Sequence, residues 1–216
     1  MLQDIEEIKA LKMSPLKHYK ETLVTVRNCT LQYNGTSEPV FKGLTFSVRQ
    51  GERIALHGTN GCGKSTLMRL ILQKAGVFTA DNSLSVNGIC ETASGLIVSY
   101  IPQDTSFLHG SIPDFCEERG LDRSLFCTVL RQLDFSRTQF SKDISEYSAG
   151  QKKKILIASS LLTPAHLYIW DEPLNYIDIF SRMQIETLLE NYRPTMLCAE
   201  HDIRFRENIG TKTINL

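Results

Sequence analysis

Apolar and polar residues alternate near the start of the chain, and buried-strand and helical patterns follow. Segments 22–33 and 44–49 alternate with period two, which predicts two half-buried strands on either side of the turn at 34–35. Further strands are predicted at 53–57, 83–86, 97–101, 167–170 and 195–199, and helices at 66–73, 149–162 and 179–191, with mostly helical, polar sequence over 111–147. Strands that alternate with helices predict an α/β fold with a mainly parallel core sheet flanked by helices.

The first residues have the spacing of a short amphipathic helix. Apolar side chains recur at helical intervals over residues 1–13, and a Ser-Pro pair at 14–15 interrupts the pattern. We expect residues 1–21 to be the end of an interdomain linker helix from a longer protein, with a capping helix of the domain itself as the alternative. Residues 22–216 then form one domain.

Composition excludes several classes of protein. A chain of 216 residues is long enough for one sizeable core. The 24 Lys+Arg against 24 Asp+Glu give no basic character that would indicate nucleic-acid binding, although this balance does not exclude a longer protein that binds RNA. The six cysteines lack zinc spacing, which predicts free, buried thiols in a reducing compartment. No apolar stretch reaches the roughly 20 residues that span a bilayer, and the N-terminus is not a signal peptide. We therefore expect a cytoplasmic chain without membrane insertion.

A glycine-rich loop lies between a predicted strand and a predicted helix. It matches the phosphate-binding pattern G-x-x-x-x-G-K-[ST] with Gly58, Thr59, Asn60, Gly61, Cys62, Gly63, Lys64 and Ser65, and Thr66 follows. The glycines let backbone N–H groups approach phosphate oxygens, and the helix N-terminus adds partial positive charge. We expect Lys64 to contact the β- and γ-phosphates of ATP and Ser65 to ligate Mg²⁺. Cys62 is either a reactive thiol or a buried, inert one.

Two consecutive carboxylates end a later apolar strand. Asp171 and Glu172 close the run LYIWDE, and a proline follows them. Such a strand, ending beside the phosphate loop, would present both carboxylates to the nucleotide. Phosphoryl transfer needs charge neutralisation and a positioned nucleophile. We therefore expect Asp171 to support Mg²⁺ and Glu172 to polarise the attacking water, which makes the chain an ATPase.

Further motifs follow in the order of the ABC ATPase family, so that the sequence resembles an ABC cassette from about residue 22 onward. The resemblance implies a P-loop fold of ABC type with an N-terminal antiparallel β subdomain and a small helical signature subdomain at about 104–162. It also implies roles for matched residues: adenine stacking at Tyr33, a Q-loop glutamine at Gln103 that senses Mg²⁺ and water, a signature motif at Ser148, Ala149, Gly150 and Gln151, a D-loop ending at Asp178, and a switch histidine at His201.

In this family the signature motif completes the ATP site of another cassette. The resemblance therefore implies a second, head-to-tail cassette, either in the same longer polypeptide or in a homodimer. Here the motif reads Tyr147-Ser148-Ala149-Gly150-Gln151 in place of the usual L-S-G-G-Q. Ala149 adds a methyl group where the opposing γ-phosphate would dock. We expect this methyl group at most to weaken the discrimination that the motif shows for that γ-phosphate.

Within the family the chain is most similar to the ABC-F class, which comprises twin-cassette proteins that act on ribosomes. The short span from Gln103 to Ser148 leaves little room for a membrane-docking subdomain. The run from Gly150 to Glu186 resembles the second, C-terminal cassette of ABC-F proteins that protect ribosomes from lincosamide, streptogramin A and pleuromutilin antibiotics. The resemblance implies the ribosome or its RNA as a partner. The alternatives are the ATPase subunit of an ABC membrane transporter and a regulatory module that binds nucleotide without turnover.

Three consecutive lysines, Lys152, Lys153 and Lys154, follow the signature motif at the start of a predicted helix. The helix dipole does not favour cations there. They could contact ribosomal RNA, but we interpret them as a solvated face of the helix.

Overall fold

The computed structural model describes residues 12–200 and 202–216. A parallel sheet has the order β5-β6-β7-β3-β8, and an antiparallel sheet has the order β2-β1-β4. The strands are β1 (Thr22–Tyr33), β2 (Phe41–Arg49), β3 (Arg53–His57), β4 (Leu84–Thr92), β5 (Val98–Ile101), β6 (Leu167–Asp171), β7 (Met196–Ala199) and β8 (Lys212–Asn215). The predicted fold class, a parallel core sheet with an N-terminal antiparallel sheet, is confirmed.

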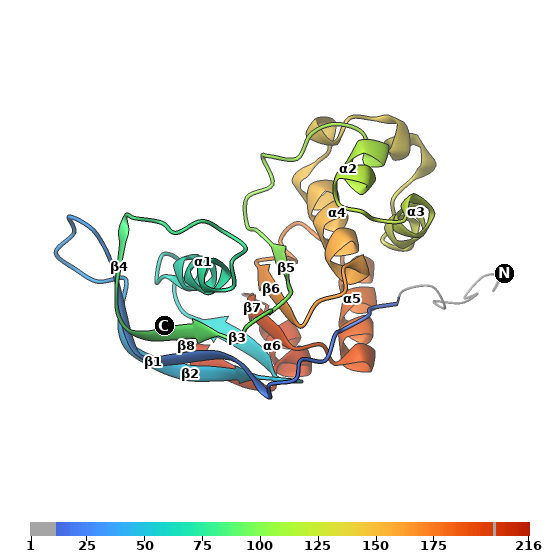
Figure 1. Cartoon of the computed structure of the whole chain (residues 1–216). Helices are drawn as coiled ribbons and strands as arrows, with labels where there is room; N and C mark the ends of the chain where they lie inside the picture. Colours follow the sequence, from blue (N-terminus) through green and yellow to red (C-terminus); the bar gives the residue numbers. More distant parts are fainter. Residues whose placement is uncertain (1–11, 201) are drawn as a thin grey trace.

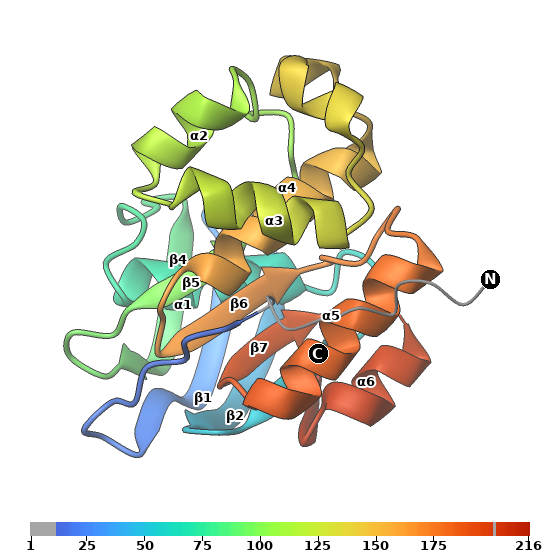
Figure 2. The same cartoon turned by 90° about the vertical axis from the view of Figure 1, so that its right-hand side faces the viewer.

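Helices lie on both faces of the parallel sheet. They are α1 (Lys64–Lys74), α2 (Ile112–Glu118), α3 (Arg123–Gln132), α4 (Ala149–Leu162), α5 (Ile179–Tyr192) and α6 (Ile203–Ile209), with 3-10 turns η1 (Arg137–Ser141) and η2 (Ile144–Glu146). Helix α1 lies beside the antiparallel sheet, whereas α2 and α3 stand apart from it (Figure 1). Helix α4 runs from that helical part toward the sheet, and α5 and α6 lie side by side (Figure 2). No helix among the described residues is long and apolar enough to cross a membrane.

Strand β6 is buried along its whole length and separates two apolar clusters. Leu167 and Ile169 belong to the cluster formed with α1 and the antiparallel sheet, whereas Tyr168 and Trp170 belong to the cluster formed with the helices of the other face. Consecutive side chains of a strand point to opposite faces. Fully burying a leucine or isoleucine side chain, such as Leu167 or Ile169, stabilises the fold by about 1.5–3 kcal/mol. The strand that carries the acidic pair is therefore firmly fixed.

Strand β4 is longer than the sequence predicted. The prediction ended at Val86, but the strand continues through Asn87 and Gly88 to Thr92. Pairing with β1 over its whole length overrides the local signal. Gly88 fits there because its φ is 98°, and a Cβ would overlap the backbone of Asn28 in β1. Strand β2 and helix α1 also begin earlier than predicted.

Two elements near the C-terminus, α6 and β8, were not predicted. Helix α6 buries only Phe205 and Ile209, so its apolar pattern is weak. Strand β8 has four residues and depends on parallel pairing with β3, which is distant in sequence. Of the helix expected at the N-terminus, residues 1–11 lie outside the described residues, and Lys12 and Met13 are not helical.

The cysteines are free thiols, as predicted. Burial raises the pKa of Cys90 and Cys198 to about 12, which suits inert thiols. Cys62 is half-buried, with its sulfur 3.8 Å from the Lys64 ammonium. This position is compatible with both a reactive thiol and an inert one.

Candidate functional site

The glycine-rich loop joins β3 to α1, as its motif requires. Lys64 is buried and folds back over the loop, where its Nζ donates to the carbonyls of Gly58 (2.8 Å) and Thr59 (3.0 Å). Gly63 precedes the helix with a φ of 103°, and a Cβ there would overlap Val40. A glycine is therefore needed at this position. The loop forms a cradle at the N-terminus of an 11-residue helix, which suits an anion.

The loop and the acidic pair line neighbouring hollows. One hollow, of about 380 Å³, is lined by Asn60, Gly61, Gly63, Lys64, Ser65, Thr66, Gln103, Glu172 and Asn175. The other, of about 260 Å³, is lined by Tyr33, Ser65, Thr66, Arg69, Tyr100, Pro102, Gln103, Asp104 and Asp171. The fold thus brings together predicted site residues that are far apart in the sequence. Tyr33 lies at the end of β1, where its hydroxyl is 3.5 Å from Thr66 Oγ1.

Asp171 is the last residue of β6 and is 2% exposed. Burial raises the pKa of its carboxyl group, and a hydrogen bond from the Ser65 hydroxyl partly opposes that rise. Its Oδ1 has no hydrogen-bond partner within the part of the chain that the structure describes. A buried acceptor oxygen of this kind is normally satisfied. Next to a serine hydroxyl, it fits a hard cation such as Mg²⁺.

Glu172 is held by two side-chain amides. Its Oε2 accepts hydrogen bonds from Gln103 Nε2 and from Asn175 Nδ2, both at 2.8 Å. The φ of Glu172 is 49°, in the left-handed region that non-glycine residues seldom adopt. Such backbone strain persists only where surrounding contacts over-determine it. The carboxylate is therefore oriented before any ligand arrives.

The signature motif opens α4, and Ser148 is its N-cap. The Ser148 hydroxyl accepts from the Gln151 amide, and the Gln151 side chain accepts from the Ser148 amide, which together form a capping box. Ser148 and Ala149 are exposed, whereas Gly150 is buried. A Cβ on Gly150 would overlap the carbonyl oxygen of Tyr176, so the start of α4 packs directly on the D-loop.

The interpretation of the three lysines as a solvated face was wrong for Lys153 and Lys154. Lys153 is 3% exposed and Lys154 is 8% exposed, and only Lys152 is half-exposed. Lys154 forms an ion pair with Asp178 at 2.6 Å. Burial alone would raise the pKa of Asp178, but hydrogen bonds from Lys154 and Ser181 outweigh it and lower the pKa to about 2.

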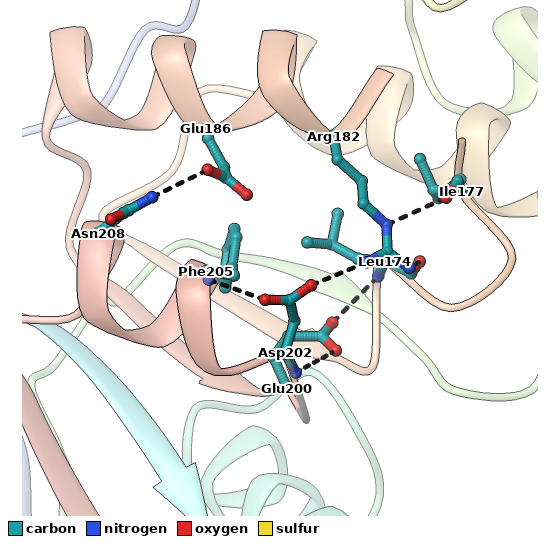
Figure 3. Close-up of polar contacts among 8 residues, drawn as sticks. All are labelled: Leu174, Ile177, Arg182, Glu186, Glu200, Asp202, Phe205 and Asn208. Atoms are coloured by element: carbon teal, nitrogen blue, oxygen red, sulfur yellow. Dashed lines mark hydrogen bonds and ion pairs between the residues drawn. The ribbon is translucent and has the colours of Figure 1, made fainter. Parts of the chain in front are cut away.

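His201 lies outside the described residues, but its neighbours are bonded to the segment that follows β6 (Figure 3). Glu200 accepts from the Leu174 amide at 3.2 Å. Asp202 accepts from Arg182 Nη1 at 2.9 Å, and the same guanidinium donates to the carbonyls of Leu174 and Ile177. The D-loop is therefore tied to the start of α6.

Three residues of this site were missed as individual contributors: Asn175, Arg182 and Lys153. Asn175 stands three residues after Glu172 within the D-loop run, and that spacing was the available signal for a chain that folds back on the carboxylate. Lys153 precedes the apolar run ILIASSLL, which indicates a helix buried on every side. For Arg182 we find no sequence signal, because its partners depend on the fold.

A parallel sheet with a phosphate loop after β3 and an acidic pair at the end of β6 defines a P-loop nucleotide-binding protein. Residues 41–175 match the ABC transporter family. The chain belongs to this family of ATP-binding cassettes, whose members work as dimers or as paired domains.

Its relatives include ABC-F proteins. The chain is 31% identical over 185 residues to the ribosome protection protein VmlR of Bacillus subtilis, covering 84% of this chain and 32% of VmlR. It is 26% identical to the ATP-binding protein Uup of Buchnera aphidicola, covering 96% and 35%, and 25% identical to the ABC transporter F family member 5 of Arabidopsis thaliana, covering 90% and 28%. The chain thus spans about a third of the length of these relatives. These likenesses are consistent with an ABC-F cassette.

A solved structure shares the fold. A bacterial Atm1-family ABC exporter with ATP bound aligns with a TM-score of 0.73 at 18% identity, covering 94% of this chain and 38% of the exporter chain. This likeness concerns the fold alone.

Proposed function

We propose that this chain is an ATP-hydrolysing cassette, the C-terminal one of a cytoplasmic ABC-F protein that acts on the ribosome. One observation carries the ATPase part of the proposal: the phosphate loop, Gln103 and Glu172 line a single hollow of about 380 Å³. Within it, amides from two different segments orient the Glu172 carboxylate. That arrangement suits a positioned base beside a bound phosphate.

The phosphate loop binds the nucleotide. The backbone amides from Gly58 to Thr66 surround the phosphates, and Lys64 exchanges its two carbonyl partners for β- and γ-phosphate oxygens. The ring of Tyr33, at the rim, stacks on adenine. Ser65, Asp171 and Gln103 would hold Mg²⁺, and the bound ion would neutralise charge that develops on the phosphates.

Hydrolysis uses a water molecule in line with the γ-phosphorus. Glu172 orients this water and accepts its proton as the new P–O bond forms. The bond to the bridging oxygen breaks, and ADP leaves with that oxygen's charge. Gln103 and Asn175 keep the carboxylate aimed at the water, and His201 contacts the γ-phosphate.

A second cassette completes the site. Ser148, Ala149, Gly150 and Gln151 present a capped helix N-terminus to the γ-phosphate bound by that partner. Four apolar side chains at the D-loop and the start of α5 support such pairing. They are 61% to 78% exposed, and we call them the α5 patch: Tyr176, Ile179, Phe180 and Met183. An exposed apolar cluster of this kind is typical of a protein interface.

The ribosomal part of the proposal is supported by relatedness to VmlR, which is named a ribosome protection protein. The test is binding of the Glu172→Gln variant to purified ribosomes, carried out with this chain and with any longer natural protein that contains it. The variant keeps the amide contacts but cannot accept the proton, so it should remain loaded with ATP. We expect it to sediment with ribosomes in ATP and not in ADP.

Glu190→Gln is the matched control, because Glu190 is exposed on α5. It should leave phosphate release and ribosome binding unchanged. If Glu172→Gln binds ATP but never sediments with ribosomes, the ribosomal role is refuted and a transporter subunit becomes the better proposal. If Glu172→Gln releases phosphate at the wild-type rate, the catalytic assignment fails.

A further inference from the structure

Lys153 is a buried cation at the carboxyl ends of two neighbouring strands. It lies in the first turns of α4 and is 3% exposed. Its Nζ donates to the carbonyl of Pro102 at 2.9 Å, just after β5, and lies 3.4 Å from the carbonyl of Asp171, at the end of β6. Lysine is almost never fully buried unless it is paired. The two carbonyl contacts therefore help to explain why a cation is buried at this position.

The two carbonyls belong to residues that immediately precede a proposed catalytic pair. Pro102 precedes Gln103, and Asp171 precedes Glu172. The Gln103 amide in turn donates to the Glu172 carboxylate at 2.8 Å. One ammonium group thus fixes the backbone on both sides of the hydrogen bond that orients Glu172. Proline has no N–H group, so its carbonyl is the backbone polar group by which this point of the loop can be held.

The charge of Lys153 also suits this position. Burial lowers the pKa of its ammonium group, and the carboxylates of Asp171, Glu172 and Glu200 act in the opposite direction. Asp104 acts in the same direction, and a cation placed among these four acidic groups offsets part of its own desolvation. An apolar side chain of the same length would fill the space without holding either carbonyl.

We propose that Lys153 is a positioning residue: it links the signature helix to Pro102 and to the end of β6, and thereby holds Gln103 against Glu172. The inference rests on the proposed catalytic role of Glu172. Lys153 acts through the backbone of two loops and does not itself touch the reacting atoms. It also gives the start of α4, which we propose faces the partner cassette, a direct contact to the hydrolytic centre.

The first test needs no turnover. In the nucleotide-free chain, the side-chain amide resonance of Gln103, assigned by its loss in Gln103→Glu, should differ from that of a solvent-exposed glutamine. Lys153→Met should move this resonance to the position of a solvent-exposed glutamine. Glu172→Gln is the reference variant, because it changes the group that accepts the Gln103 hydrogen bond and should also shift the resonance. Lys152→Met, one residue away and half-exposed, should leave it unchanged. A Gln103 resonance that is the same in Lys153→Met and wild type would overturn the proposal.

The second test separates positioning from binding. Lys153→Met should lower kcat roughly 10- to 100-fold, while KM for Mg-ATP stays within about twofold. The loss in kcat is smaller than the full rate contribution of a positioned base, because Glu172 itself remains. Lys153→Arg, which keeps donors on a long stem, should recover part of kcat. A rise in KM with kcat unchanged would overturn the proposal. If Glu172→Gln retains full turnover, the proposed function fails first, and the resonance test then decides on Lys153 alone.

Folding is controlled separately. If Lys153→Met does not fold by circular dichroism, Lys153→Gln replaces it. Glutamine keeps a polar end group but is too short to reach both carbonyls. The Gln103 resonance should move in this variant as well, and an unmoved resonance would again overturn the proposal.

Discussion

The guanidinium group of Arg182 offers a direct test of how the D-loop is attached to the start of α6. Arg182 Nε donates to the Ile177 carbonyl at 3.0 Å, Nη2 donates to the Leu174 carbonyl at 2.9 Å, and Nη1 pairs with Asp202 at 2.9 Å. Arg182→Met removes all three contacts and keeps most of the aliphatic stem. The D-loop then loses its attachment to the start of α6 (Figure 3).

The free energy of unfolding that Arg182→Met should lose depends on how far its contacts are exposed to solvent. The side chains of Arg182 and Asp202 are 30% and 29% exposed, so solvent screens their ion pair, which is worth about 0.5 kcal/mol. A charged donor to a carbonyl contributes about 1.5–3 kcal/mol when buried, and roughly 1 kcal/mol when water can replace it. Two such bonds and the ion pair together give about 2–3 kcal/mol. For a chain of this size the melting temperature should fall by about 5–10 °C.

The assay is thermal and urea unfolding followed by circular dichroism, with Arg204→Met on the exposed face of α6 as the control. Arg182→Lys separates charge from geometry. An ammonium group keeps the charge near Asp202 but cannot reach all three acceptors, so most of the loss should remain. An Arg182→Met protein within about 0.5 kcal/mol of wild type, or full recovery in Arg182→Lys, would refute this reasoning.

Three further outcomes are expected. Lys64→Ala should weaken Mg-ATP binding by roughly 10- to 150-fold in calorimetry, because it removes the cation that faces the phosphates, and an unchanged Kd would contradict the site assignment. The Asp178 pKa of about 2 lies below its ordinary value of 3.8, so its stabilisation should be full above about pH 4 and disappear as the pH falls through about 2. Denaturation midpoints of wild type and Asp178→Asn should therefore converge at low pH, and a gap that persists at pH 2 would contradict the ion-pair origin. Phe180→Asp with Met183→Asp should reduce nucleotide-dependent pairing in sedimentation, whereas Ile203→Asp, also exposed, should not. Equal pairing by all of these proteins would exclude the α5 patch from the interface.

Local patterns predicted the parts of the site that depend on one segment. The phosphate loop is a contiguous strand, turn and helix start, so its spacing was sufficient to place Lys64 and Ser65. Asp171 likewise ends a strand whose apolar run was visible in the sequence. These predictions needed no knowledge of distant contacts.

Other features depend on contacts between distant segments. Lys153 was assigned to a solvated face because a lysine run is usually exposed, yet its partner Pro102 lies 51 residues away. Strand β8 pairs with β3 across more than half of the chain, and four residues carry too little pattern to reveal this. Contact with distant backbone, which propensity does not encode, decided both cases.

The D-loop contacts both the Glu172 carboxylate and the signature helix. Asn175 bonds to Glu172, the Tyr176 carbonyl packs on Gly150 of the signature helix, and Asp178 pairs with Lys154 of the same helix. Tyr176 adopts a left-handed φ of 65° and is 78% exposed, so this strained residue faces solvent between those contacts. A partner cassette that covers Tyr176 would therefore act on a segment bonded both to the carboxylate that we propose is hydrolytic and to the helix whose N-terminus we propose completes the partner's site. Under the proposed function, one short loop couples pairing to hydrolysis, and a change at Tyr176 should alter both together.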